Sequence, residues 1–364
     1  MQFYIYSQDL VRLGVVDAFK TLIWRRKYHT PGTFEMYLSA TDDHLNLLKE
    51  KNIIVIRQNG TNDSGYIHSV NIEKTTSGEE LIKVSGYSLL GYLYRRIIWN
   101  PIVFKGRTEE LAHEIVGKNA INPVDANRII PNLVPGAIQN YQESISYQNS
   151  YGNVCEQLEQ IGLSSGLGFD ILFDERKKEL LFNVLKGVDR SVSQSMVPPV
   201  IFSREFDNIL DENYYYSTRD YKNTALIGGE GDGDARILTS LNNEIGYNRY
   251  ESFVDARDLR KEVDGNVMSD DEYQETLLQR GNEKLSDNKI ITTFEAQIIP
   301  TGNYIYRQDY DLGDIVTVID RKWGVRVDTR ITEVEEIYED GRLEITPTFG
   351  NRIPTISQII KKMR

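Results

Sequence analysis

Apolar and polar residues alternate over short segments at both ends of this 364-residue chain, whereas its middle follows a helical period. Within residues 21–39, Leu22 and Trp24 alternate with polar residues before a turn, and Phe34 and Met36 do so after it. A period of two places every second side chain on one face of a half-buried antiparallel strand. The chain is therefore expected to build most of its structure from sheets.

The middle of the chain has a different pattern. Helical periods occur at 89–98, 108–118 and 151–166, and two strand-like runs joined by a charged turn follow the glycines of 162–168. Runs of helices followed by strands are typical of an α+β unit. We therefore expect a second domain here.

Strand patterns return from about residue 198 and continue to about residue 350. A polar helical segment at 270–287 interrupts them. The string Glu339-Asp340-Gly341 lies between two alternating runs, which is a strong signal for a β-hairpin.

These patterns predict a mainly β, multidomain fold with an α+β insert, in which two barrel-like β-domains of related topology accompany a helical insertion. The predicted N-terminal barrel-like domain spans residues 1–87, and the α+β domain spans 88–197. The second barrel-like domain spans 198–350 and carries the helical insertion at about 255–288. A C-terminal tail occupies 351–364.

The helix expected at 270–287 has a narrow apolar stripe, formed by Tyr273, Leu277, Leu278 and Leu285. A stripe this narrow can dock on one surface, but the charged remainder of the helix would be costly to bury. We expect the helix to lie outside a barrel, either against a neighbouring protein or over the open edge of its own domain.

Charge and cysteine content exclude several classes of protein. The formal net charge is −12, which argues against sustained binding to nucleic acid phosphates. A single cysteine, Cys155, rules out an internal disulfide framework and a cysteine-based zinc site. The N-terminus lacks the features of a signal peptide and no apolar run reaches the length of a membrane span, so no membrane anchor is expected.

The four histidines, His29, His44, His68 and His113, are scattered and form no HExxH motif or other metal-ligand spacing. His113 lies beside two glutamates on a predicted helix, where a solvated helical face explains it better than a general base. Metal catalysis therefore has no support in the sequence.

The glycine-rich segment at 228–236 is the most suggestive short motif, because backbone amides can hold phosphate and Asp232 and Asp234 can bind calcium. It lacks the Lys-Ser/Thr ending of a Walker loop and the glutamate that ends an EF-hand loop. We expect an exposed flexible loop, and the sequence leaves open whether a metal binds there. Ser164 and Ser165 follow a helix and do not match a nucleophile elbow.

Carboxylate pairs such as Asp270/Asp271 and Glu335/Glu336 are common in a chain with 54 acidic residues. They leave a two-carboxylate glycosidase without specific support. We therefore predict that the protein is not an enzyme and assign no catalytic, cofactor-binding or metal-binding residues and no cofactor.

Several strings in order along the chain resemble the siphophage tail hub proteins of Gram-positive phages and prophages. Each string is weak alone, but the ordered set covers nearly the whole chain. The strings are YxxPGTFEMYL (28–38), VSGYSLLGYLYRR (84–96), GFDILFD (168–174), GVDRS (187–191), VIFSREFDN (200–208), DYKNTALIGGEGDG (220–233), ESFVDARDL (251–259), DYDLGDIVTVID (309–320) and ITPTFG (345–350).

This resemblance implies a homotrimer in which two β-domains of each chain alternate around a central channel, giving a pseudo-sixfold ring at the virion tail tip. It also implies contacts with the distal tail protein, the tail tube and a tip, fibre or tape-measure protein, with DNA passing through the channel without specific binding. Some relatives carry a C-terminal cell-wall hydrolase, for which the end of this sequence leaves little room. Two other interpretations remain open, a tail-associated cell-wall hydrolase and a carbohydrate-binding receptor module.

Overall fold

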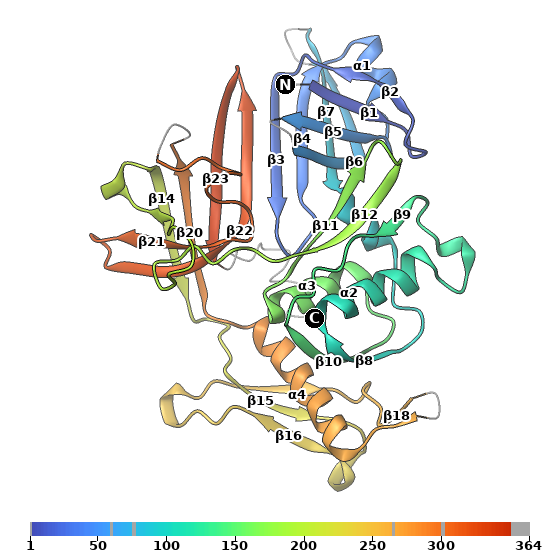
Figure 1. The fold of residues 1–364 in the computed structure, drawn as a ribbon, viewed down its shortest axis with the longest axis vertical. Coiled ribbons are helices and arrows are strands. Elements are labelled where there is room, and N and C mark those ends of the chain that lie inside the picture. The colour runs from blue at the N-terminus through green and yellow to red at the C-terminus, as the bar shows by residue number, and fades with distance from the viewer. Residues whose placement is uncertain (1, 59–60, 75–77, 264–265, 300–302, 351–364) are drawn as a thin grey trace.

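The computed structural model describes residues 2–58, 61–74, 78–263, 266–299 and 303–350, and Figure 1 shows their arrangement. Strands dominate, several sheets are present, and four separate hydrophobic cores can be distinguished. The mainly β, multidomain class is confirmed. The C-terminal tail expected at 351–364 lies outside the described residues, and the domain boundaries given above stay predictions.

The N-terminal β unit consists of seven strands and one short helix. Apolar side chains from all seven strands enclose one core, in which Trp24 stacks on Phe34 with ring centroids 5.1 Å apart. The helix begins after Thr41, whose hydroxyl accepts a hydrogen bond from the backbone N–H of His44. The elements are β1 (Gln2–Tyr6), β2 (Arg12–Val16), β3 (Thr21–Lys27), β4 (Thr33–Ser39), α1 (Asp42–Leu47), β5 (Ile53–Gln58), β6 (Thr61–Lys74) and β7 (Glu80–Ser88).

The α+β unit follows and packs against the outer face of the N-terminal sheet. Its core contains Tyr6, Val55 and Tyr66 from that sheet together with side chains of its own helices. The elements are the 3₁₀ helix η1 (Leu89–Arg95), β8 (Ile102–Arg107), α2 (Thr108–Val116), the π-helical turn η2 (Gly117–Ile121), the 3₁₀ turn η3 (Ala126–Arg128), β9 (Leu133–Pro135), β10 (Ser144–Asn149), α3 (Val154–Ser165), β11 (Gly168–Asp174) and β12 (Glu179–Leu185).

The C-terminal β unit has its own core around Phe202, Tyr310 and Phe349. The expected hairpin at Glu339-Asp340-Gly341 is present, with Glu339 opposite Arg342. The elements are β13 (Ile201–Phe202), the 3₁₀ turn η4 (Arg204–Phe206), β14 (Ile209–Ser217), β20 (Ile291–Ile298), β21 (Ile315–Asp320), β22 (Val325–Glu339) and β23 (Arg342–Gly350).

Between β14 and β20 the chain forms a separate insert unit. One long helix, α4, covers one face of a three-stranded sheet of order β16-β15-β17, and Tyr273 and Leu277 of the helix lie in the shared core. The elements are β15 (Thr224–Gly228), η5 (Gly233–Ala235), β16 (Leu238–Leu241), η6 (Gly246–Asn248), β17 (Glu251–Asp255), β18 (Glu262–Val263), β19 (Asn266–Val267) and α4 (Asp270–Ser286).

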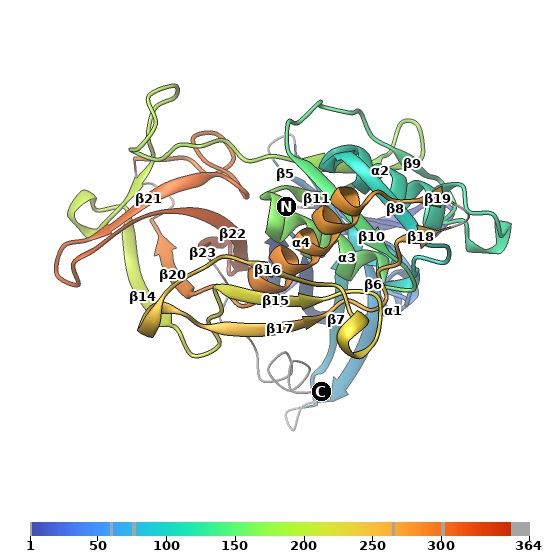
Figure 2. The ribbon, with the colours of Figure 1, turned by 90° about the horizontal axis from the view of Figure 1, so that it is seen from below.

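The helix α4 also contacts α3 and β10 of the α+β unit, so it lies between two parts of the same chain, as Figure 2 shows from below. It begins at Ser269 with a capping box in which the Ser269 hydroxyl and the Glu272 carboxylate each accept a backbone N–H of the other residue. The helix expected at 270–287 is thus present and not enclosed by a barrel. It covers a small sheet of its own unit.

The strands of the two β units join into one 13-stranded sheet, whose main path runs β14-β20-β23-β22-β3-β4-β7-β6-β5-β1-β2. No closed barrel is found in the residues described here. Closing the N-terminal unit would require β2 to pair with β3, but β3 pairs with β22 of the other unit instead. The barrel-like curvature of the N-terminal unit is therefore that of an open sheet wrapped around its core.

Candidate subunit interface

The seam between the two β units is an antiparallel pairing of β3 with β22, which runs from Lys27 opposite Glu333 to Thr21 opposite Glu339. Charged side chains cross this seam in register. Arg25 of β3 forms an ion pair with Glu335 of β22, and its guanidinium also lies 3.8 Å from Glu35 of β4. Cross-strand pairs of opposite charge stabilise a sheet and fix its register.

A second, more buried network of ion pairs and hydrogen bonds connects the two β units close to this seam. Arg307 donates hydrogen bonds to Asp63 of β6 and to the buried Glu336 of β22, the latter over 2.7 Å. Arg26 of β3 donates to Asp311 over 2.6 Å and lies 3.6 Å from Asp63. Two arginines thus neutralise three carboxylates that come from both β units. A network of this kind holds the units in one relative orientation.

Asp170 of β11 lies beside this network, where burial raises the pKa of its carboxyl group from 3.8 to about 6, although the nearby Arg26 opposes the shift. A folded-state pKa above the unfolded value means that the folded protein binds the proton more tightly. Stability from this group is therefore fully present below about pH 4 and is lost as the pH rises to about 6.

We expect Asp170→Asn to raise the free energy of unfolding at pH 7 by about 1–3 kcal/mol and to leave it nearly unchanged at pH 4. The amide keeps an oxygen that can accept the 2.8 Å hydrogen bond from the Ile171 backbone N–H, so this contact is retained. Urea denaturation of both proteins at the two pH values measures the effect. An equal difference at pH 4 and pH 7 would rule out the titration of Asp170 as its cause.

The two ends of the long sheet are free edges within the described residues. β2 pairs only with β1, and β14 pairs only with β20. Apolar side chains are exposed on both end strands: Leu13 of β2 is 46 % exposed, and Tyr216 of β14 is 55 % exposed. Figure 1 places the two ends on opposite sides of the molecule. A free edge with exposed apolar side chains is a ready surface for pairing with another chain.

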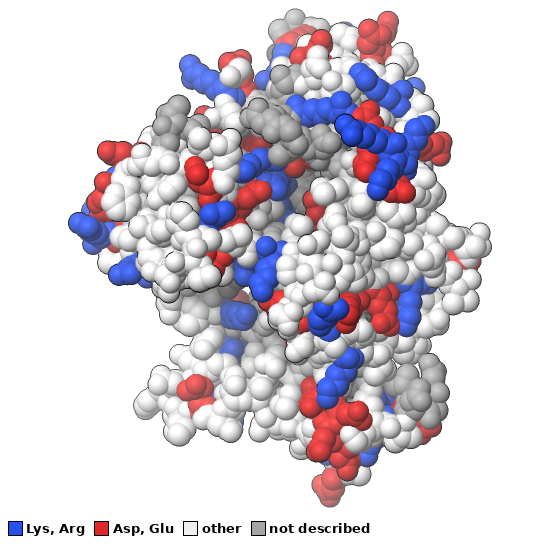
Figure 3. Space-filling view, in the orientation of Figure 1, with Lys and Arg blue, Asp and Glu red and all other residues white. Residues whose placement is uncertain are grey.

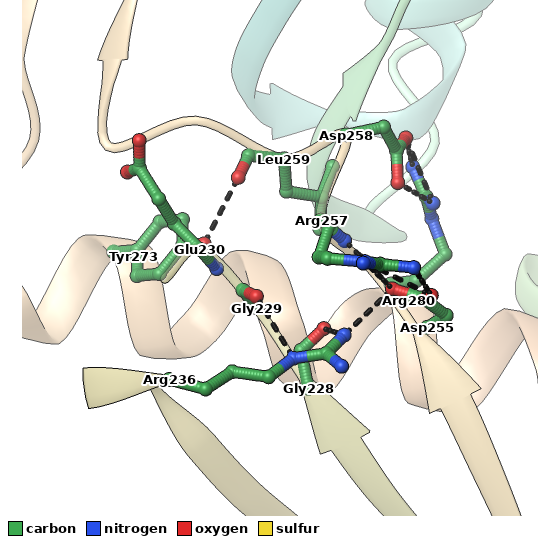
Figure 4. A network of polar contacts seen from close by, with 10 residues as sticks. All are labelled: Gly228, Gly229, Glu230, Arg236, Asp255, Arg257, Asp258, Leu259, Tyr273 and Arg280. Carbon is green, nitrogen blue, oxygen red and sulfur yellow. Dashed lines mark hydrogen bonds and ion pairs between the residues drawn. The ribbon is translucent and has the colours of Figure 1, made fainter. Parts of the chain in front are cut away.

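The glycine-rich segment at 228–236 is more ordered at its base than the sequence suggested. The Arg236 side chain donates to the carbonyl oxygens of Gly228 and Gly229, over 2.9 and 3.3 Å, and to Asp255 over 2.6 Å. The Tyr273 hydroxyl accepts from the Glu230 backbone N–H and donates to the Leu259 carbonyl, and Figure 4 shows both sets of contacts.

These contacts explain why the segment needs glycine. A Cβ atom at Gly229 would lie 2.7 Å from the Tyr273 hydroxyl oxygen, and one at Gly228 would lie 2.6 Å from the Arg236 guanidinium. The segment is therefore a tight connection between β15 and β16 with an exposed tip at 232–235. Gly228 and Gly229 thus serve close packing, whereas Gly231 and Gly233 adopt positive φ angles, which favour glycine.

Exposed acidic side chains gather at this end of the molecule. Asp232 and Asp234 lie at the tip of the glycine-rich segment, and Asp270 and Asp271 lie in the first turn of α4. Figure 3 shows the concentration of acidic side chains at the lower end of the view. Acidic residues in the first turn of a helix are favoured by its dipole, which is a structural reason for part of this cluster.

The histidines lie far apart and have separate roles. Burial lowers the pKa of His29 to about 4, and its Nδ1 atom is 2.9 Å from the Leu167 carbonyl oxygen. Burial also lowers the pKa of His113, whose ring packs edge-on against Phe182. His44 lies in α1 and His68 in β6. The expected solvated setting of His113 is therefore wrong, because its ring is largely covered by the α+β core.

The remaining residues singled out from the sequence have structural partners. The hydroxyls of Ser164 and Ser165 donate to the Ile161 carbonyl oxygen at the end of α3. Cys155 is buried in the same helix, and burial raises the pKa of its thiol. Glu335 and Glu336 point to opposite faces of the seam, where each contacts an arginine.

Among the residues described, no three His, Cys, Asp or Glu side chains come together in an arrangement that could hold a metal ion. The helices within those ranges also include none that is both long and apolar enough to cross a membrane.

Sequence reasoning missed the seam. The basic run Arg25-Arg26-Lys27 and the acidic residues Glu333, Glu335 and Glu336 lie about 300 residues apart, and they face each other across β3 and β22. Their opposite charges on two alternating segments were the available signal. The buried partner of Glu336, Arg307, comes from a loop whose sequence gives no indication of its contacts.

Comparisons with known proteins give a consistent result. Residues 2–351 match the family described as Siphovirus ReqiPepy6 Gp37-like protein. No curated protein matches the chain in sequence.

Three solved structures share the fold over nearly the whole chain. A tail protein from Neisseria meningitidis MC58 has a TM-score of 0.59 at 14% identity, with 96% of each chain covered. The 43 kDa tail protein of prophage MuSo2 from Shewanella oneidensis has a TM-score of 0.59 at 13% identity, covering 96% of this chain and 98% of that one. The prophage tail protein gp18 from Listeria monocytogenes EGD-e has a TM-score of 0.54 at 11% identity, covering 100% of this chain and 98% of that one.

Proposed function

Because this chain belongs to the Siphovirus ReqiPepy6 Gp37-like protein family, we propose that it is the structural hub of a phage tail tip or baseplate. The fold shared with tail proteins from three bacterial genomes supports a place in the tail. In this role the protein links the tail tube to the tip, fibre or spike and surrounds the channel through which DNA leaves.

The observation that carries the proposal is the continuity of the sheet. Two β units of one chain are joined edge to edge through β3 and β22, and β2 and β14 are free edges at the two ends of the main strand path within the described residues, apart from the short side branch β21-β13. A unit with two different free edges can join copies of itself head to tail, and such contacts close into a ring when the rotation between copies allows it. We propose that β2 of one chain meets β14 of the next.

Three such chains would place six β units around one axis, which suits a junction between a threefold tip and a sixfold tube. The contact between chains would then resemble the seam within each chain, since both join an N-terminal unit to a C-terminal unit by strand edges. The partners of the ring would be a distal tail protein or the tail tube on one side and a tip, fibre or tape-measure protein on the other.

We propose that the hub has no catalytic activity and that DNA passes without specific binding. The absence of nucleophile and base pairs in the sequence motifs and the half-buried, structural settings of His29 and His113 support this view. Hydrolysis of purified peptidoglycan by this protein, lost on replacement of a single carboxylate, would contradict it.

The mass of the purified protein in solution tests the ring directly. We expect three times the 41.9 kDa chain mass, about 126 kDa, by light scattering over a range of protein concentrations. A protein that stays at the mass of one chain up to high micromolar concentration would contradict a ring that forms without other tail proteins.

A further inference from the structure

A polar cleft of about 430 Å³ lies between the α+β unit and the insert unit. One wall is formed by β10 and the C-terminal end of α3, through Ser144 and Ser165. The other wall is formed by the C-terminal half of α4 and the segment that leads into β15. Figures 1 and 2 both show α3 and α4 next to each other at this place.

The charge of this cleft differs from that of the whole protein. Lys222 and Lys289 line it, and no carboxylate among the described residues does, although acidic residues exceed basic ones by 12 over the chain. Neither lysine ammonium group forms an ion pair or hydrogen bond with the residues described in the structure. Lysines on this protein often have such partners, as Lys105 has Glu275 and Lys186 has Glu143. Two lysines without an ion-paired carboxylate among the described residues give the lining of the cleft a positive charge.

Neutral hydrogen-bonding groups surround these two charges. Gln279 and Asn282 lie three residues apart on α4 and therefore share one face of the helix, which lines the cleft. Asn242 reaches the cleft from the loop after β16, where its amide nitrogen donates a 2.7 Å hydrogen bond to the Asn223 carbonyl. Carbonyl oxygens and amide N–H groups of this kind bind hydroxyl groups well.

One further feature of the lining favours a ligand. The ring of Tyr221 lies in the cleft wall and packs against Tyr250 with centroids 5.1 Å apart, which fixes its orientation. Thr108 also borders the cleft, but its side chain is fully buried, so its hydroxyl offers no hydrogen bond to a ligand there.

We propose that this cleft binds a phosphorylated sugar or polyol. The two lysines would bind the phosphate as point charges, the amides and serine hydroxyls would bind the ligand's hydroxyl groups, and the tyrosine ring would lie against its carbon skeleton. The inference does not depend on ring formation, because every residue invoked belongs to one chain.

Two other ligand classes fit less well. Nucleic acid binding needs a row of cations along a phosphate backbone, and the cleft has two lysines. An apolar peptide needs apolar side chains to dock on, and the aliphatic lining is limited to Ile145 and Leu285 among the described residues. The ligand chemistry could come from a free sugar phosphate or from a repeating unit of an anionic surface polymer.

The test uses the full chain and isothermal titration with glycerol 3-phosphate, glucose 6-phosphate, inorganic phosphate and glucose. We expect the two organic phosphates to bind, and to bind at least 10-fold more weakly to the variant with Lys222→Gln and Lys289→Gln. The matched control carries Lys49→Gln and Lys177→Gln, two exposed lysines outside the cleft, and has the same net charge. It should bind like the unaltered protein.

Binding of a poly(glycerol phosphate) polymer distinguishes the two possible sources of the ligand. If the polymer binds more tightly than glycerol 3-phosphate, per repeating unit, the natural ligand is a surface polymer. If the two bind equally, the natural ligand is a free phosphate ester. The proposal is overturned if no probe binds at millimolar concentration, if glucose binds as well as glucose 6-phosphate, or if the control variant loses affinity equally. It is also overturned if the cleft variant changes only assembly, because the cleft is then a protein contact.

Discussion

Replacing Arg307 with methionine is expected to lower the free energy of unfolding by about 3–5 kcal/mol, because it removes the shared cation from two carboxylates at the seam. Glu336 is 4 % exposed and loses its 2.7 Å hydrogen bond, and Asp63 keeps, among the described residues, only its ion pair with Arg26. Methionine retains most of the apolar stem of arginine, so the change in the free energy of unfolding reports mainly the loss of the charge. Urea denaturation at one fixed protein concentration measures the loss.

The control for this substitution is Arg326→Met on β22, where the arginine is exposed and has no ion pair within the described residues. It should change the free energy of unfolding by no more than about 0.5 kcal/mol. Adding Glu336→Gln to Arg307→Met should restore part of the stability, since a buried amide costs less than an unpaired carboxylate. If the double variant is no more stable than Arg307→Met alone, the network does not act through charge.

Leu13→Asp and Tyr216→Asp, made together, are expected to weaken association between chains by about 100-fold or more, which corresponds to about 2.7 kcal/mol. Each substitution places a carboxylate on one free edge, where contact with the next chain would remove it from water at a cost of several kcal/mol. The folded chain itself should be unaffected, because both side chains are exposed in it. Sedimentation velocity over a concentration series measures the shift from trimer to monomer.

The single variants give a sharper version of this test. A chain with Leu13→Asp keeps an intact β14 edge, and a chain with Tyr216→Asp keeps an intact β2 edge. Each alone should be monomeric, and an equal mixture should form dimers of about 84 kDa that cannot grow further. A matched control with Val124→Asp and Met196→Asp adds the same charge at two positions that are 96 % and 90 % exposed and lie off both edges. If the control dissociates as readily, net charge explains the effect and the edges do not.

Much of the fold could be predicted from local patterns in the sequence. Alternation around Leu22, Trp24, Phe34 and Met36 correctly identified β3 and β4, since each buries one face of a strand in a common core. The helices at 108–118, 151–166 and 270–287 were found within a few residues of their bounds. The resemblance to siphophage tail proteins, drawn from strings that are weak singly but ordered along the chain, is confirmed.

The same patterns could not predict that the expected barrels stay open and join into one sheet within the described residues. Alternation shows that β3 has a buried face, but it does not show which strand occupies its edge, because edge pairing depends on the backbone. Complementary charges about 300 residues apart stabilise the pairing of β3 with β22. The register of this pairing is seen only in the folded chain. A single sequence contains little information on such long-range contacts.

The candidate sites also depend on long-range contacts that the sequence alone does not show. The glycines of 228–236 were recognised as unusual, but their reason lies in the close approach of Arg236 and Tyr273, which come from different parts of the insert unit. Lys222 and Lys289 are ordinary surface lysines in the sequence. Only the fold places them in one cleft that no carboxylate of the described residues lines.

The arrangement of chains in the assembled particle tests the proposed hub most directly. Negative-stain electron microscopy of the purified protein is expected to show rings with threefold symmetry, six β units around a central opening, and the insert units at one face or the periphery. Images that contain only single chains, or closed particles without an opening on the symmetry axis, would contradict the account.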